Sequence, residues 1–236
     1  MSSGTTGLTR GSGLQEQWVL TSLHQNTMSS SQNIEHVILF KLKDDAEPSE
    51  VKAAVNKIKG LQTIDEVLYL TAAPLRSSSN SSLAFTHVSH SRFRSTSELS
   101  AYGVHPLHLR MKKEDNHLID DVLAVDWFTN EFGGDHVTVP PGSGVRVTLW
   151  KLKEGLGDET RSEILEGMRK IKEGEEVTEF TYGVNFSDRG KGFSMAILTV
   201  FRSESELEAA DDANQYEKFK DYLDTTLVIE FVVPSQ

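Results

Sequence analysis

The chain has 236 residues, of which 37% are apolar and 25% charged, an ordinary composition for a globular protein. Its formal charge of −11 argues against nucleic-acid binding, which depends on lysine and arginine neutralising phosphates. The lack of cysteine excludes disulfides and thiolate metal sites, and no apolar run approaches the roughly 20 residues of a membrane span. We therefore expect neither a nucleic-acid partner nor a membrane partner.

The first 32 residues differ from the rest in composition. They are rich in serine, threonine and glycine, and their one apolar island is Trp18-Val19-Leu20, which is too short for the core of a signal peptide. We interpret residues 1–32 as a disordered leader. A cleaved targeting peptide is the alternative, and Met28 is a second candidate start. The cytoplasm is the default compartment, with peroxisome and plastid as alternatives.

Strand-like and helix-like patterns alternate in the residues that follow. Runs rich in β-branched residues predict strands, and amphipathic runs that begin near proline or serine predict helices. The expected elements of the first half are strand 34–43, helix 48–59, strand 67–71, strand 82–93, a helix that begins after Ser95 or Ser97, and strand 122–128.

The second half repeats this order. The heptapeptide Phe93–Leu99 recurs as Phe201–Leu207, and two further matches keep the same order along the chain. Glycine and proline between the halves indicate a linker at 131–142, which leaves domains at 33–130 and 143–234. The expected elements of the second half are strands 145–153, 177–184, 193–201 and 226–232, with helices at 158–172 and after Ser203 or Ser205.

Each half reads β-α-β-β-α-β, the ferredoxin-like order of an α+β fold. Such a sheet covers one face with its helices and leaves the other bare, and a large bare apolar face is unstable in water. We therefore predict that the two sheets pack face to face, as an intramolecular pseudo-dimer that forms an α/β barrel with an interior cavity. Two independent domains are the alternative, and further homodimerisation of the whole chain stays open.

Three segments carry a resemblance to a known family: Ile34–Lys43, Phe85–Val88 and the motif Tyr102-x-x-His105-Pro106-x-His108. They resemble the stress-responsive dimeric α/β-barrel domain family, well over residues 33–128 and weakly over 144–233. The resemblance implies a role in stress response and, as in some plant members, defence against fungi. One relative, olivetolic acid cyclase, closes a linear polyketide by an aldol condensation, which implies a carbon–carbon lyase activity as an alternative.

The resemblance also points to site residues. Tyr102 and His108 match the catalytic pair of the cyclase, His36 and His87 match its cavity histidines, and His105 joins them as a candidate ligand contact. Imidazole accepts and returns a proton near neutrality, so His108 would act as the base while the Tyr102 hydroxyl stabilises an enolate. Structural roles are the alternative for all of them, above all a turn role for His105.

Histidine is distributed unevenly between the copies. Six histidines lie between residues 33 and 130, and none follows His136. The second copy therefore has the pattern of a structural partner without the titratable groups. Its matching positions hold Arg146, Met195, Ala210, Ala213 and Tyr216 in place of His36, His87, Tyr102, His105 and His108.

The sequence lacks glycine-rich phosphate loops, and we expect no cofactor and no metal site built from side chains. A divalent cation held by main-chain carbonyls between Lys59 and Asp65 is implied by the resemblance alone. We expect His90 and His117 at the surface. Three functions stay open: a stress or defence protein whose cavity binds a small apolar ligand, a polyketide cyclase-like lyase, and a purely structural interaction module with a filled interior.

Overall fold

The structure is a computed structural model, which describes residues 33–79, 83–129, 137–172, 177–210 and 217–235. The predicted leader, at 1–32, lies outside the described residues, as does the first half of the predicted linker. None of the described helices is long and apolar enough to cross a membrane.

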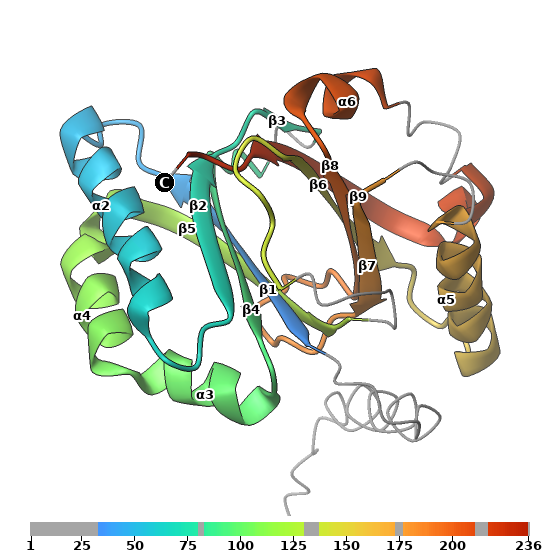
Figure 1. Cartoon of the computed structure of the whole chain (residues 1–236). Helices are drawn as coiled ribbons and strands as arrows, with labels where there is room; N and C mark the ends of the chain where they lie inside the picture. Colours follow the sequence, from blue (N-terminus) through green and yellow to red (C-terminus); the bar gives the residue numbers. More distant parts are fainter. Residues whose placement is uncertain (1–32, 80–82, 130–136, 173–176, 211–216, 236) are drawn as a thin grey trace, which may run out of the picture. The chain divides into compact units, whose positions relative to one another are not determined.

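The first copy forms a four-stranded antiparallel sheet in the order β2-β4-β1-β5. This order and the two crossovers through helices are those of a ferredoxin-like unit. Its helices lie on the outer face of the sheet (Figure 1). Its elements are β1 (Ile34–Leu42), α2 (Pro48–Gly60), η1 (Leu61–Thr63), β2 (Tyr69–Pro74), β4 (His87–Phe93), α3 (Thr96–Val104), α4 (Pro106–Asp115), η2 (Asn116–Leu118) and β5 (Ile119–Phe128).

The second copy repeats the arrangement in the order β9-β6-β8-β7, and the two-residue strand β3 of the first copy extends its edge. The predicted pair of ferredoxin-like units is therefore confirmed. The elements are β3 (Ser77–Ser78), β6 (Gly144–Leu152), α5 (Asp158–Lys172), β7 (Glu179–Val184), β8 (Met195–Phe201), α6 (Glu204–Ala209), η3 (Glu217–Tyr222) and β9 (Leu223–Val232).

The repeated heptapeptide marks the same helix start in both copies. Ser95 caps α3 by accepting a hydrogen bond from the backbone N–H of Glu98, and Ser203 caps α6 through Glu206 in the same way. Each glutamate also accepts a hydrogen bond from the backbone N–H of the arginine before the serine, an arrangement related to the capping box. The sequence similarity is therefore a similarity of local hydrogen bonding.

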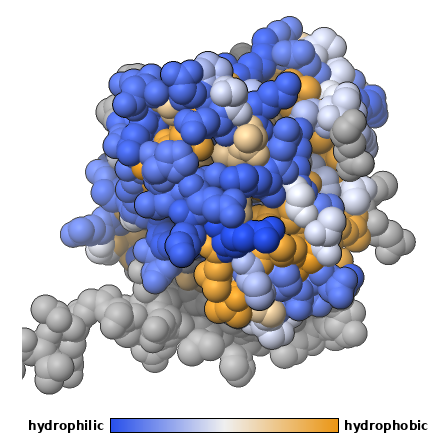
Figure 2. Space-filling view, turned by 90° about the vertical axis from the view of Figure 1, so that its left-hand side faces the viewer, coloured by the Kyte–Doolittle hydropathy of each residue, from blue (hydrophilic) through white to orange (hydrophobic). Residues whose placement is uncertain are grey.

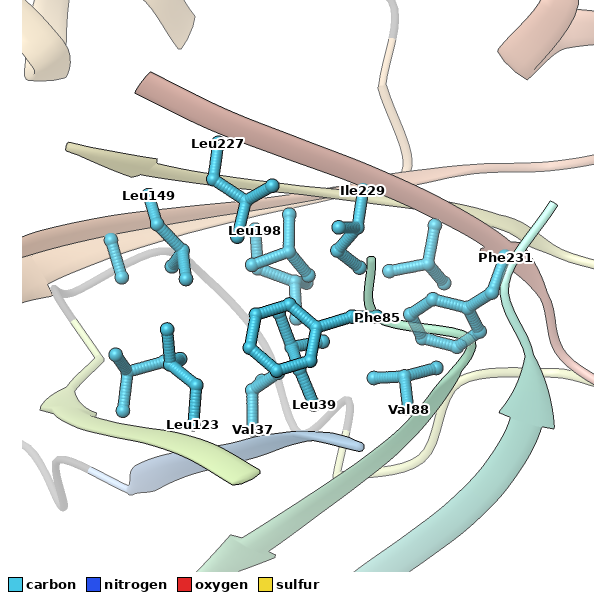
Figure 3. Packing of buried hydrophobic residues seen from close by; sticks show 14 of the residues in the cluster. Val37, Leu39, Phe85, Val88, Leu123, Leu149, Leu198, Leu227, Ile229 and Phe231 are labelled. Atoms are coloured by element: carbon cyan, nitrogen blue, oxygen red, sulfur yellow. The ribbon is translucent and has the colours of Figure 1, made fainter. Parts of the chain in front are cut away.

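The two sheets pack face to face, as predicted. Because side chains alternate along a strand, every second residue of β1, β5, β6 and β9 points into the space between the sheets. Apolar side chains from both sheets fill this space (Figure 3). The described residues therefore form an apolar core between the sheets, and a ligand chamber there stays a prediction. Residues in it include Val37, Leu39, Val88, Leu123, Val147, Leu149, Leu198, Leu227, Ile229 and Phe231.

The copies also exchange backbone at their edges. Ser77–Ser78 of the first copy pairs with β9, the edge strand of the second unit. In return, residues 185–189 of the second copy run along β5, where Phe186 N–H donates to the Asp126 carbonyl and Ala124 N–H donates to the Arg189 carbonyl. This exchange gives hydrogen-bond partners to backbone N–H and C=O groups that the edge strands would otherwise expose.

Candidate acid–base site of the first copy

The first strand places His36 under the helices and not between the sheets. Glu35 and Val37 face the second sheet, so His36, between them in sequence, points to the opposite face. The expectation that this histidine would face the barrel interior is therefore wrong. Its surroundings on the helix side include Phe93 and Tyr102, whose rings it meets edge-on at centroid distances of 6.0 and 6.3 Å.

Three of the predicted residues come together at this place. The rings of Tyr102 and His108 stack with centroids 4.5 Å apart and planes inclined by 26°. His36 and Tyr102 are each 4% exposed, and His108 is 9% exposed, so all three side chains are largely removed from water. A fourth residue, Asp126 on β5, completes the group through a hydrogen bond with His36 Nδ1.

The turn at Pro106 explains the stacked rings. Proline disfavours helical backbone in the residue before it, so α3 ends at His105 and a new helix begins. His105 caps this helix, because its Nδ1 accepts a hydrogen bond from Leu107 N–H at 3.2 Å. Tyr102 in the last turn of α3 and His108 in the first turn of α4 therefore meet across the bend. His105 itself has a structural role here and is not part of the ring cluster.

Hydrogen bonding defines the protonation of His108. Its Nδ1–H donates to the Gly103 carbonyl at 3.1 Å, which leaves Nε2 with the free lone pair. Burial lowers the pKa of His108, and the Gly103 carbonyl opposes this shift without cancelling it. The imidazole is therefore neutral at pH 7 and can accept a proton at Nε2.

Tyr102 has the opposite role. Burial raises the pKa of Tyr102 far above its usual range, so the hydroxyl keeps its proton at any physiological pH. A buried neutral phenol next to a neutral imidazole is an acid–base pair with one donor and one acceptor. Such a pair can hold a carbonyl oxygen through the phenol while the imidazole takes a proton from the adjacent carbon.

Asp126 is the residue that the sequence analysis missed. It lies directly opposite His36 in the β1–β5 register and is buried. A carboxylate accepts, so His36 donates from Nδ1 and keeps a fixed ring orientation. A usable signal was present: Asp126 interrupts the apolar run Leu123–Trp127, where a charged residue needs a partner.

His87 belongs to the same face but to a different part of it. It lies opposite Phe40 at the far end of β4 and hydrogen-bonds Thr86 Oγ1 at 3.0 Å. Burial lowers the pKa of His87. With Asp115 it borders a small apolar cavity of about 30 Å³ between β1, α2 and α4. The remaining cavity walls are Phe40, Leu42, Val51, Ala54, Val55, Ile58, Met111, Leu118 and Ile119.

Two residues, Ile58 and Met111, lie between the cavity and the ring cluster: they line the cavity and pack against the apolar core that contains Tyr102, which does not itself line the cavity. The helix above it is loosely packed: none of the residues of α2 is buried. In the second copy, α5 buries Ile164, Met168 and Ile171. Among the described residues, the helix over the first sheet is thus less deeply buried than its counterpart over the second. Figure 2, which views the molecule from the side of α2 and α4, shows apolar atoms reaching the surface there.

In the second copy an ion pair occupies the equivalent place. Arg146, at the position of His36, pairs with Glu230, at the position of Asp126, at 2.6 Å. The Arg146 guanidinium also donates to the carbonyls of Leu207 and Ala210, where the first copy has α3 and Tyr102. The long arginine therefore fills the volume that the rings occupy in the first copy. The match of Tyr216 to His108 lies outside the described residues.

Of the histidines expected at the surface, His117 is exposed, and that prediction is confirmed. The prediction for His90 is wrong: it is fully buried between the sheets, with Nε2 at 2.6 Å from Glu35. No cluster of three metal-ligating side chains occurs among the described residues. The main-chain cation site near Lys59 to Asp65 stays a prediction.

Both copies match one family model. The model of the stress responsive A/B barrel domain matches residues 34–129 and residues 145–233. The chain belongs to this family. A stress-response A/B barrel domain-containing protein of Arabidopsis thaliana is 42% identical over 224 residues, which are 91% of this chain and 84% of that relative. A second Arabidopsis protein of the same description, DABB1, is 41% identical over 207 residues, which are 86% of this chain and 97% of DABB1.

Solved bacterial structures share the fold of this A/B barrel over both copies. A candidate monooxygenase from Fusobacterium nucleatum has a TM-score of 0.61 and 16% identity, over 88% of this chain and 94% of that one. A candidate monooxygenase from Lactobacillus acidophilus has a TM-score of 0.55 and 11% identity, over 85% and 93%. At these identities the likeness concerns the fold alone. The family predicted from three short segments is confirmed.

Proposed function

We propose that this stress-response A/B barrel protein binds a small apolar molecule between α2, α4 and the first sheet, with the polar end of the ligand at Tyr102 and His108. The observation that carries the proposal is the loose packing of α2 beside the buried ring cluster. The second copy differs in both features: its α5 buries Ile164, Met168 and Ile171, and the ion pair of Arg146 replaces the ring cluster.

The apolar part of the ligand would lie under α2. The cavity of about 30 Å³ has room for about one water molecule in the ligand-free protein. It shares Leu42, Val51, Val55 and His87 with an open groove of about 600 Å³ at the start of α2. Because the α2 side chains are at most partly buried, moving this helix outward would cost less packing energy than moving α5, which has three buried side chains. The groove would serve as the entrance.

The polar part of the ligand would meet one donor and one acceptor. The Tyr102 hydroxyl donates, and His108 Nε2 accepts. A carbonyl compound with an acidic or hydroxylated neighbouring carbon satisfies both groups. An apolar ligand without such a group would leave the acceptor of His108 unpaired.

Binding can be tested with 1-anilinonaphthalene-8-sulfonate, a fluorescent probe of apolar sites. Val55 lines both the cavity and the groove, so Val55→Trp should fill them and weaken probe binding by at least about tenfold. The matched control is Leu165→Trp, at the equivalent position of α5. Equal binding by Val55→Trp and the unchanged protein would contradict the proposal. Native mass spectrometry of protein purified from its source would identify a retained ligand.

The protonation of His108 favours a second candidate function, a polyketide cyclase-like lyase. His108 Nε2 would remove a proton from the carbon beside a carbonyl, and the resulting enolate would attack a second carbonyl of the same chain. The Tyr102 hydroxyl would stabilise the developing oxyanion, and protonated His108 would return its proton to the new alkoxide. No cofactor enters this sequence of steps.

The lyase function is tested by incubating the protein with a linear β-polyketide thioester and analysing for ring-closed product. His108→Ala and Tyr102→Phe should remove turnover and leave the unfolding temperature nearly unchanged. The variant Tyr222→Phe in the second copy is the control, with turnover retained. Equal product with and without the two site residues would exclude them from catalysis. A loss of folding in both variants would assign them a structural role.

The remaining alternatives stay predictions. A purely structural module would have its interior filled by side chains, and apolar side chains do pack between the two sheets. The ring cluster and the cavity under α2 favour ligand binding over a purely structural role. A role in defence against fungi is tested by growth inhibition with purified protein, using Val55→Trp as the variant with a filled cavity.

A further inference from the structure

We propose that Asn185, in the degenerate second copy, is a positioning residue for the His36–Asp126 pair of the first copy. The inference takes from the proposed function only the role of the site in binding a ligand; the contacts of Asn185 do not depend on it. It assigns to the second copy a part in that site beyond packing of the two sheets. The contacts that carry it lie between β5 and the segment that follows β7.

Consecutive residues of the second copy hold both backbone polar groups of Asp126. Asn185 Oδ1 accepts a hydrogen bond from Asp126 N–H at 2.9 Å, and Phe186 N–H donates to the Asp126 carbonyl at 2.9 Å. β5 is an edge strand, so these groups would otherwise lack a partner on that side. The backbone from which the Asp126 carboxylate extends to His36 is therefore fixed from the second copy.

Asn185 is itself held rigidly. It is 1% exposed, and its Nδ2 donates to the carbonyls of Phe193 at 2.8 Å and Ser187 at 3.2 Å. Its Oδ1 also accepts from Ser187 N–H at 2.9 Å. Gly190 leaves room for the amide, because a Cβ there would lie 2.3 Å from Asn185 Nδ2. Because four hydrogen bonds fix the orientation of this amide, it can hold the neighbouring strand in a defined position.

The internal repeat supplies a comparison. At the other end of the molecule, Arg76 N–H donates to the carbonyl of Glu230, the counterpart of Asp126. This contact mirrors that of Phe186. The counterpart of Asn185 is Leu75, whose side chain has no acceptor and packs against the core between the sheets. At the other edge, Ser79 Oγ accepts from Val228 N–H at 2.9 Å, two residues before Glu230. A side-chain acceptor on the strand residue that carries the buried carboxylate is therefore present at Asp126 and replaced by leucine at Glu230, which packing of the fold alone does not require.

The test measures the exchange with water of the His36 Nδ1 proton, by NMR of imidazole-labelled full-length protein. The hydrogen bond to Asp126 should protect this proton, and His36→Asn assigns its resonance. Asn185→Ala should raise its exchange rate by at least about tenfold, because the carboxylate loses its fixed backbone. Gly190→Ala should have the same effect by displacing the amide of Asn185.

Two further variants separate positioning from general stability. Leu75→Ala, at the equivalent position, should lower the free energy of unfolding but leave the exchange rate unchanged. Asn185→Asp keeps an acceptor for Asp126 N–H. When the two variants are compared at the same free energy of unfolding, the His36 Nδ1 proton should exchange more slowly in Asn185→Asp than in Asn185→Ala. Equal rates in Asn185→Ala and the unchanged protein, or an equal rise in Leu75→Ala, would overturn the proposal. If Asn185→Ala does not fold, Gly190→Ala and Asn185→Asp decide. No ligand enters the measurement, so its failure is distinct from failure of probe binding.

Discussion

Glu35, His90 and Arg92 form a buried charged cluster on the inner face of the first sheet. His90 Nε2 lies 2.6 Å from Glu35, and Arg92 bridges Glu35 to Glu179 of the second copy at 3.0 and 2.7 Å. Burial alone would raise the pKa of Glu35, but Arg92 and His90 hold it at about 2. The same positions of the second copy are apolar: Val145, Leu198 and Val200.

The first prediction concerns the stability of the protein in mild acid. Burial lowers the pKa of His90 from 6.5, so the unfolded chain binds the proton before the folded one does. The stabilisation associated with neutral His90 is therefore present above pH 6.5 and lost as pH falls below it. His90→Leu should reduce the slope of unfolding free energy against pH between 6.5 and 5 by up to about 1.4 kcal/mol per unit.

Urea unfolding at several pH values measures this slope. His87 and His108 have pKa values lowered in the same direction, so some dependence should remain in the variant. The groups around His90 are Glu35, Arg92 and the ring of Tyr69. An unchanged slope in His90→Leu would mean that this histidine does not titrate with folding.

A second prediction concerns Glu35. Its folded pKa lies below its usual value of 4.5, so it contributes stability that is present above pH 4.5 and lost as pH falls towards 2. Glu35→Gln should remove this part of the acid unfolding, and should destabilise the protein by about 1–3 kcal/mol at pH 7, because Arg92 loses one of its two carboxylate partners and keeps Glu179. Urea unfolding at several pH values between 7 and 2 checks both effects. An equal loss of unfolding free energy between pH 4.5 and 2 in both proteins would contradict the argument.

The side of the sheet on which His36 lies illustrates what the sequence leaves open. From Ile34 to Leu39 both faces of β1 are buried, one by helices and one by the second sheet. Polar residues at 35 and 36 are adjacent and must point in opposite directions, but the pattern does not tell which is which. Asp126 escaped notice for the same reason, because its partner follows from the β1–β5 register and not from any local motif.

At the scale of elements, α2 and α5 occupy equivalent places with different packing. Met168 in α5 is fully buried, while its counterpart in α2, Ile58, is half-buried beside the cavity. The order of helices and strands was predictable because periodicity and the repeat agree in both copies. The partial burial of α2 was not predictable, since Val51, Val55 and Ile58 have the same spacing as the apolar residues of a fully packed helix face.

This difference gives a third prediction. Met168→Ala should destabilise the protein by about 2–5 kcal/mol, because it opens a cavity in a closed core. Ile58→Ala at the equivalent position should cost only about 1–2 kcal/mol, because its side chain already borders empty space and solvent. Urea unfolding of the two variants measures the costs. Equal costs would show that α2 is packed as firmly as α5.

At the scale of the whole molecule, the two copies share one core and exchange edge segments. The cluster between the sheets contains residues from every strand of both copies except β3 and β7, and the described backbone crosses between copies on both sides. The exchanged segments were not predictable, because Ser77–Ser78 has no strand pattern of its own. Both copies depend on the shared core between the sheets, so we expect them to unfold together.

The last prediction tests this cooperativity with tryptophan fluorescence. Trp127 reports on the first copy and Trp150 on the second, and both are fully buried. In a Trp18→Phe background, Trp127→Phe leaves only the second reporter and Trp150→Phe only the first. Each substitution lowers stability by its own amount, so both variants should also be followed by circular dichroism. In each variant the fluorescence midpoint in urea should coincide with that of circular dichroism, because the sheets cannot separate without exposing their shared apolar faces.

If the second copy unfolded first, its reporter would change at a lower urea concentration than the dichroism signal. The helix-side core of the first copy would then be enough to keep that copy folded, and the Asn185 clamp would be released before the acid–base site is lost.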